Sequence, residues 1–319
     1  MNKKYVTDKE KFDGIIKTNL LLSGINNGAF CYLIPQNDGT VSEYTLYYSK
    51  TTFNVFVKEM QTLYPHHYSK YSGNPNATQN RGGVGGELIE KPGRYGLTPP
   101  KMASVASSSR FCYLALRNGT DVLVNNKYIS GDDIEFEKEC RIFDNISTAP
   151  QLDGFIEQEE YNIYIEAKCH EIFDSHKVEL KNKYLDYFEK DDILRTFLKK
   201  AAKDNETFTL PLSLFRIEKK SSRFDIKQLI CHLLGIKEQK GDKKAKLVYL
   251  FFEPATDNDE DRIFINKVFD ELSTEIKLIF ESDIIKGFCE TYNIELMAIK
   301  EKSRIMEALT KFNEVTIYP

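Results

Sequence analysis

The sequence predicts an α/β or α+β fold in which helices flank a mixed central β-sheet, and three stretches support this. Tyr161–Lys168 alternates between apolar and polar residues, with the two-residue period of a strand. Lys246–Phe252 is a continuous apolar run, as expected for a strand covered on both faces. Phe224–Ile236 carries apolar residues at helical spacing. Together these patterns predict helices layered on a sheet.

The N-terminal part begins with a predicted helix over Asp8–Leu22. Two strands are expected near Phe30–Ile34 and Tyr44–Tyr48, joined by a turn at Asn37-Asp38-Gly39. A second helix is predicted over Thr52–Leu63.

Residues 64–100 are rich in Gly, Asn, Pro and Tyr and predict a loop. Its glycine run lacks the Gly-Lys-Ser/Thr ending of a P-loop, so a nucleotide site is not indicated. One interpretation is a loop that orders on DNA, with Arg81, Lys91 and Arg94 meeting phosphates. The alternative is a packed structural loop.

A helix is predicted from an N-cap at Gly131-Asp132-Asp133 through Phe143. Phe136, Cys140 and Phe143 would form its buried stripe. Next, an apolar run around Leu152–Ile156 and the alternating Tyr161–Lys168 predict two strands paired as a hairpin.

This hairpin would bring together three charged side chains. Glu166 and Lys168 lie two residues apart, so they share one face of their strand, roughly 6 to 7 Å apart. Asp153 on the preceding strand can come opposite them. Two carboxylates are suitable ligands for Mg²⁺, which usually takes one or two protein carboxylates and substrate phosphate. The chemistry that fits is metal-assisted phosphodiester hydrolysis, with Lys168 orienting a water or stabilising developing negative charge.

The D-(x)12-E-A-K spacing from Asp153 to Glu166 and Lys168 resembles the D…(D/E)-x-K signature of the PD-(D/E)XK nuclease superfamily. S-S-S-R-F-C-Y, F-E-K-E-C-R-I-F, L-D-G-F-I and Y-I-E-A-K-C-H-E extend the resemblance to restriction-endonuclease-like bacterial proteins, over about residues 102–250. The proline stands three residues before the aspartate, at Pro150, rather than beside it.

The resemblance implies a restriction-endonuclease-like core and further site residues. Superfamily nucleases carry a glutamate into the metal site from a neighbouring helix. Glu137 and Glu139 both compete for that role, with Glu139 slightly nearer the apolar face of the predicted helix. Gln228 resembles the glutamine of a Q-x-x-x-Y helix that holds DNA, although His232 replaces the tyrosine. A partly buried helix with two polar residues explains this pair equally well.

The remaining segments complete the predicted layers. They comprise helices over Lys177–Tyr187, Asp191–Lys203, Arg262–Ile285 and Ser303–Phe312, an extended piece over 206–216 and a strand over Ile294–Ile299.

Charge divides the chain unevenly. Residues 1–130 hold 15 Lys and Arg against 9 Asp and Glu, whereas the whole chain has a net charge of −4. This asymmetry favours a basic N-terminal region, residues 1–101, that contacts DNA beside a nuclease-like core over 102–319. The two regions can equally form one continuous domain, and ordinary variation in surface charge is the alternative explanation.

The six cysteines form no C-x-x-C pair and no zinc-like cluster, and predict reduced thiols of a cytoplasmic protein. No apolar run approaches the length of a membrane span, so no membrane partner is expected. The favoured function is a metal-dependent DNA endonuclease in which Asp153, Glu166 and Glu139 bind Mg²⁺, with Mn²⁺ as a substitute, and Lys168 and Gln228 assist. A homodimer is expected only for cutting both strands at a symmetric site. Two other functional classes remain open: a non-catalytic DNA-binding or interaction protein, and a structural or regulatory protein.

Overall fold

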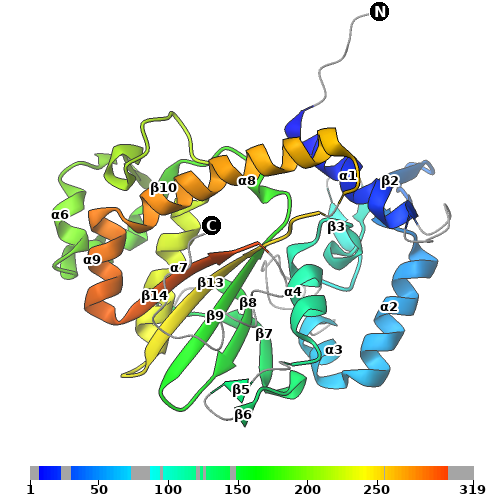
Figure 1. The fold of residues 1–319 in the computed structure, drawn as a ribbon, viewed down its shortest axis with the longest axis horizontal. Coiled ribbons are helices and arrows are strands. Elements are labelled where there is room, and N and C mark those ends of the chain that lie inside the picture. The colour runs from blue at the N-terminus through cyan, green and yellow to red at the C-terminus, as the bar shows by residue number, and fades with distance from the viewer. Residues whose placement is uncertain are drawn as a thin grey trace, which may run out of the picture.

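The structure is a computed structural model that describes residues 7–22, 30–72, 87–93, 96–119, 123–124, 127–143, 149–254 and 256–300. Its centre is a mixed five-stranded sheet flanked by helices, which confirms the predicted fold class (Figure 1). Among these residues, no helix combines the length and the apolar character needed to cross a membrane.

The central sheet has the strand order β14-β13-β9-β8-β7. The strands β7, β8 and β9 pair antiparallel, and β13 and β14 then add in parallel. The predicted hairpin and both later strands are therefore confirmed. The bounds are β7 (Ile134–Glu139), β8 (Gln151–Glu157), β9 (Tyr161–Lys168), β13 (Lys244–Phe251) and β14 (Ile294–Ile299).

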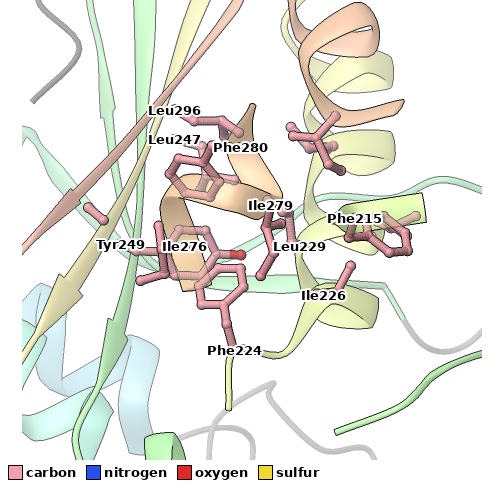
Figure 2. Close-up of a cluster of buried hydrophobic side chains, with 14 of the residues drawn as sticks. Phe215, Phe224, Ile226, Leu229, Leu247, Tyr249, Ile276, Ile279, Phe280 and Leu296 are labelled. Carbon is pink, nitrogen blue, oxygen red and sulfur yellow. The ribbon is translucent and has the colours of Figure 1, made fainter. Parts of the chain in front are cut away.

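Both faces of the sheet are covered by helices. One face packs on α7 (Ile226–Gln239), α8 (Asp259–Phe280) and α9 (Asp283–Tyr292). Figure 2 shows part of this core between strands and helices. Its labelled side chains come from β13 and β14 (Leu247, Tyr249, Leu296), from α7 and α8 (Ile226, Leu229, Ile276, Ile279, Phe280) and from Phe215 and Phe224.

The opposite face is covered by the N-terminal half of the chain. Its helices are α2 (Lys50–Leu63), α3 (Pro65–Ser72) and α4 (Ser108–Leu116). On β9, Ile163, Ile165 and Ala167 face these helices while Tyr164 faces the other core, as the alternation predicted. The N-terminal region therefore packs directly on the central sheet.

The other N-terminal elements are α1 (Asp8–Leu22), β1 (Phe30–Pro35), β2 (Val41–Tyr48), β3 (Lys91–Gly93), β4 (Gly96–Thr98), β5 (Leu123–Val124) and β6 (Lys127–Tyr128). Of these, α1, β1 and β2 were predicted, whereas the four short strands β3 to β6 were not. Gly39 turns β1 into β2 with φ +83°, a conformation that glycine adopts without strain. The helix α3 lies within the segment that was predicted to be a loop. It begins at Pro65, and proline is favourable as the first residue of a helix.

The helix predicted through Phe143 is wrong. The segment forms a 3₁₀ turn, Gly131–Asp133, capped by Ser130, and then the strand β7. Phe136 and Cys140 are four residues apart and suggested helix, but the residues between Ile134 and Glu139 also alternate. Pairing with β8 selects the strand.

Two predicted helices in the middle of the chain are also largely wrong. Residues 177–187 form β10 (Val178–Lys181) and the start of α5 (Leu185–Lys190). Residues 191–203 contain only the short α6 (Leu194–Leu198) and β11 (Ala202–Lys203), and β12 (Thr207–Leu210) follows. The strand β12 pairs with both β10 and β11, so sheet formation overrides local helical spacing here.

Near the C-terminus, the single helix predicted over residues 262–285 is two helices, α8 and α9, separated at the buried Ser282. The helix predicted over residues 303–312 lies outside the described residues.

Candidate functional site

The site is built where β8 and β9 separate. Their pairing runs from Glu157–Asn162 to Gly154–Ile165 and ends there. Beyond that point, the Asp153 carboxylate accepts a hydrogen bond from the Ala167 amide at 2.7 Å, in place of a backbone carbonyl. Asp153 is thereby fixed in the fork between the two strands, beside Glu166.

Three side chains next to this fork are joined by hydrogen bonds. The Lys168 ammonium donates to Glu166 Oε1 and to Gln228 Oε1, both at 2.7 Å. The Gln228 amide also donates to Glu166 Oε1 at 2.9 Å. Asp225 caps α7 by accepting from the Gln228 backbone amide, which fixes the start of the helix. The structure thus brings Glu166, Lys168 and Gln228 together as predicted.

His232 occupies the next turn of α7 on the same face. Its Nε2 lies 3.8 Å from Glu166 Oε2, and its Nδ1 lies 3.3 Å from the Tyr249 hydroxyl. Burial, followed by the nearby Lys168 charge, lowers the pKa of His232 to about 3. The ring is therefore neutral, and it packs against Glu166 without forming an ion pair.

Glu137 is the third carboxylate of the site. In the pairing of β7 with β8, Glu137 lies opposite Asp153, because the flanking pairs are Phe136–Gly154 and Lys138–Leu152. It is 5% exposed, adopts a left-handed φ of +52°, and its Oε1 is buried without a hydrogen-bond partner. Since Asp153 in turn neighbours Glu166, three carboxylates form a row across β7, β8 and β9.

Glu139 does not reach this row. It lies opposite Gln151, two residues further along β7, and pairs with Arg141 at 3.1 Å. The preference for Glu139 depended on a helical geometry that the segment does not have. Glu137 is the glutamate that the structure places beside Asp153.

Ser109 links this row to α4. Its hydroxyl donates to Asp153 Oδ1 at 3.4 Å and also lies within hydrogen-bonding reach of Glu137. Ser109 lies in the S-S-S-R motif, whose sequence alone does not predict a contact with Asp153. Its position becomes evident only when α4 packs on β8.

Burial raises the pKa of all three carboxyl groups. Burial, followed by the charge of Glu166, raises the pKa of Asp153 to about 8. Burial also raises the pKa of Glu166, and burial together with Asp153 raises that of Glu137 well above its ordinary value. For Lys168, burial alone would lower the pKa, but Glu166 and Glu171 outweigh it and raise that pKa. A cation placed among these carboxylates would relieve their mutual repulsion.

These residues suit a partly hydrated Mg²⁺ ion rather than a metal that is fully surrounded by protein ligands. Within the described ranges, no group of three or more His, Cys, Asp and Glu is arranged to hold a metal ion. Mg²⁺ keeps several waters and needs only one or two protein carboxylates, which Asp153 and Glu166 supply. Glu137 Oε1 is buried beside Asp153 without a hydrogen-bond partner. A buried oxygen of this kind is normally satisfied by a water molecule or a cation, which fits a metal bound next to it.

A second charged pair comes from the N-terminal region. Glu87, 1% exposed, lies 3.6 Å from the ammonium of Lys101, and both influence the pKa of the carboxylate row. No spacing in the sequence connects either residue with the D…E-x-K motif. Of the three loop cations predicted to meet phosphates, Lys91 begins β3, whereas Arg81 and Arg94 lie outside the described residues.

A small cavity of about 120 Å³ lies beside the site, lined by Lys168, Gln228, Glu171, Tyr249 and residues around Arg223. It is large enough for a few water molecules. Solvent can therefore lie next to the ammonium of Lys168.

Comparisons of the chain with protein-family models, with curated proteins and with solved structures gave no match.

Proposed function

We propose that the protein is a metal-dependent endonuclease that hydrolyses DNA phosphodiester bonds, as the resemblance to PD-(D/E)XK nucleases implies. One observation carries the proposal. Asp153 and Glu166 converge where β8 and β9 separate, with Lys168 hydrogen-bonded to Glu166 at 2.7 Å. A buried carboxylate pair can hold Mg²⁺, and an ammonium at its side can stabilise the negative charge that develops in phosphodiester hydrolysis.

In this mechanism Asp153 and Glu166 would hold Mg²⁺, and Glu137 would add negative charge beside Asp153. Once bound, the metal acidifies a water and neutralises charge on a phosphoryl oxygen. The fixed position of Asp153, through the Ala167 amide, keeps the ligands from reorganising during the reaction.

Lys168 acts as a hydrogen-bond donor and not as a base, because its carboxylate neighbours keep it protonated. Glu166 and Gln228 hold the ammonium, which leaves it able to orient the attacking water or to stabilise developing negative charge. Gln228 serves as a positioning residue, since it contacts both Glu166 and Lys168.

The test is cleavage of plasmid and linear DNA in Mg²⁺ or Mn²⁺, with EDTA as the metal-free control. Asp153→Ala and Lys168→Ala are expected to lose cleavage while retaining the fold. Lys243→Ala is a matched control, because Lys243 also pairs with a glutamate, Glu157, at 2.7 Å but at the opposite end of the hairpin. Full activity of both site variants would refute the proposal. DNA binding that persists in EDTA without cleavage by the wild type would favour a binding protein on this fold.

A further inference from the structure

We propose that Lys101 contacts a backbone phosphate of the DNA on the solvent side of the carboxylate row, an inference that rests on the proposed nuclease function. Lys101 belongs to the N-terminal region and lies outside the D…E-x-K motif. Its placement, its exposure and its charge environment support this role.

The backbone around Lys101 is fixed to the site. Lys101 opens a 3₁₀ helix whose next two residues, Met102 and Ala103, are fully buried. The Met102 amide donates to the Glu87 carbonyl at 3.0 Å, and the buried Arg110 donates to the Met102 carbonyl at 3.1 Å. Arg110 lies on α4, so the helix whose Ser109 contacts Asp153 also holds this segment.

The side chain of Lys101 is partly exposed to solvent, although its ammonium lies close to the buried carboxylate of Glu87. It is 60% exposed, whereas its partner Glu87 is almost fully buried. The 3.6 Å from its Nζ to Glu87 Oε2 is too long for a hydrogen bond, and no other described residue accepts one from this ammonium. Lys101 therefore has donors available for an incoming acceptor.

The other ammonium of the site is differently placed. Lys168 is 12% exposed in its side chain and is held by Glu166 and Gln228. It faces the carboxylates from within the fold. Lys101 thus complements Lys168, with one cation enclosed in the site and a second, more exposed cation near it.

Lys101 also lies within the electrostatic reach of the whole carboxylate row. Burial alone would lower its pKa, but Glu87, Glu137, Asp153 and Glu166 together raise it. Any carboxylate of the row that is ionised repels a polyanionic substrate, and a nearby cation offsets this repulsion where a phosphate approaches.

The test compares Lys101→Gln and Lys101→Arg with the wild type. Lys50→Gln is the matched control, because Lys50 is also an N-terminal lysine, 59% exposed, that pairs with a glutamate, Glu90, at 3.0 Å. Binding of a short fluorescent DNA duplex is measured in EDTA by anisotropy at several salt concentrations. Thermal unfolding verifies that each variant is folded.

Removing one phosphate contact should lower the slope of log affinity against log salt by about 0.9 and weaken binding about tenfold in Lys101→Gln. Lys101→Arg should retain the slope, and Lys50→Gln should match the wild type. A wild-type slope and affinity in Lys101→Gln would overturn the inference.

Cleavage by the same proteins in Mg²⁺ separates the two proposals. A wild type that binds DNA with the predicted Lys101 effect but does not cleave would refute the nuclease function and leave the phosphate contact standing. A wild type that cleaves, together with a Lys101→Gln variant that binds and cleaves normally, would refute only the role of Lys101.

Discussion

Asp153→Asn should stabilise the metal-free protein, increasingly so as the pH rises. The pKa of Asp153 is raised from 3.8 to about 8 in the folded protein. A carboxyl group whose pKa is raised by folding favours the folded state below its unfolded pKa, and that contribution is lost as the pH rises toward its folded pKa. Asparagine imitates the protonated form and can still accept from the Ala167 amide.

The size of the effect follows from the pKa. Each pKa unit corresponds to about 1.36 kcal/mol, so between pH 5 and pH 8 the variant can gain at most about 4 kcal/mol relative to the wild type. Glu137 and Glu166 belong to the same cluster, and their protonation readjusts when the Asp153 charge is removed. We therefore expect the variant to gain about 2 kcal/mol in the free energy of unfolding, below this upper limit.

The assay is urea unfolding in EDTA at pH 5, 6, 7 and 8. Asp191→Asn is the matched control, because hydrogen bonds from Tyr292 and Leu194 and the Lys237 ion pair outweigh burial and lower the pKa of Asp191. That variant should be destabilised at neutral pH. If Asp153→Asn lowers the free energy of unfolding at pH 8, or changes it equally at all four pH values, the reasoning is refuted. Added Mg²⁺ should stabilise the wild type more than the variant.

Three further outcomes are expected. Glu137→Gln should weaken Mn²⁺ binding in calorimetry about tenfold or more, because it removes a carboxylate beside Asp153, whereas Glu139→Gln should not; equal effects would contradict the assignment. Gln228→Leu should slow single-turnover cleavage of bound DNA with little change in affinity, and an unchanged rate would exclude its positioning role. Gly235→Ala should lower the free energy of unfolding by about 1 to 3 kcal/mol in urea titrations, because its Cβ would lie 2.6 Å from the Cys140 carbonyl oxygen; a neutral effect would show that α7 can shift away.

The hairpin and its charged residues could be predicted because they are encoded locally. The alternation of Tyr161–Lys168 sets which side chains share a face, and α7 places Gln228 and His232 one turn apart. Those signals involve neighbouring residues, so one sequence suffices to detect them.

Glu137 was harder to assign because β7 has two competing periodicities. Phe136, Cys140 and Phe143 are spaced as on a helix, whereas Ile134 to Glu139 alternate as on a strand. Only pairing with β8 decides between them and sets the register that places Glu137 opposite Asp153.

Glu87 and Lys101 could not be predicted at all, since their proximity to the site depends on the packing of α4 and of the segment that Arg110 holds. Tertiary contacts between distant segments leave no periodic signal in the sequence.

The order of the strands bears on when the candidate site is completed during synthesis. The strand β13 pairs with β9 along its full length, from Lys244–Tyr161 to Phe251–Lys168, yet it follows β9 by more than seventy residues. A nascent chain that ends after β9 carries every carboxylate of the site but lacks Gln228 and the strand that supports Glu166 from the other side. Such a chain therefore lacks a complete site until α7 and β13 have emerged.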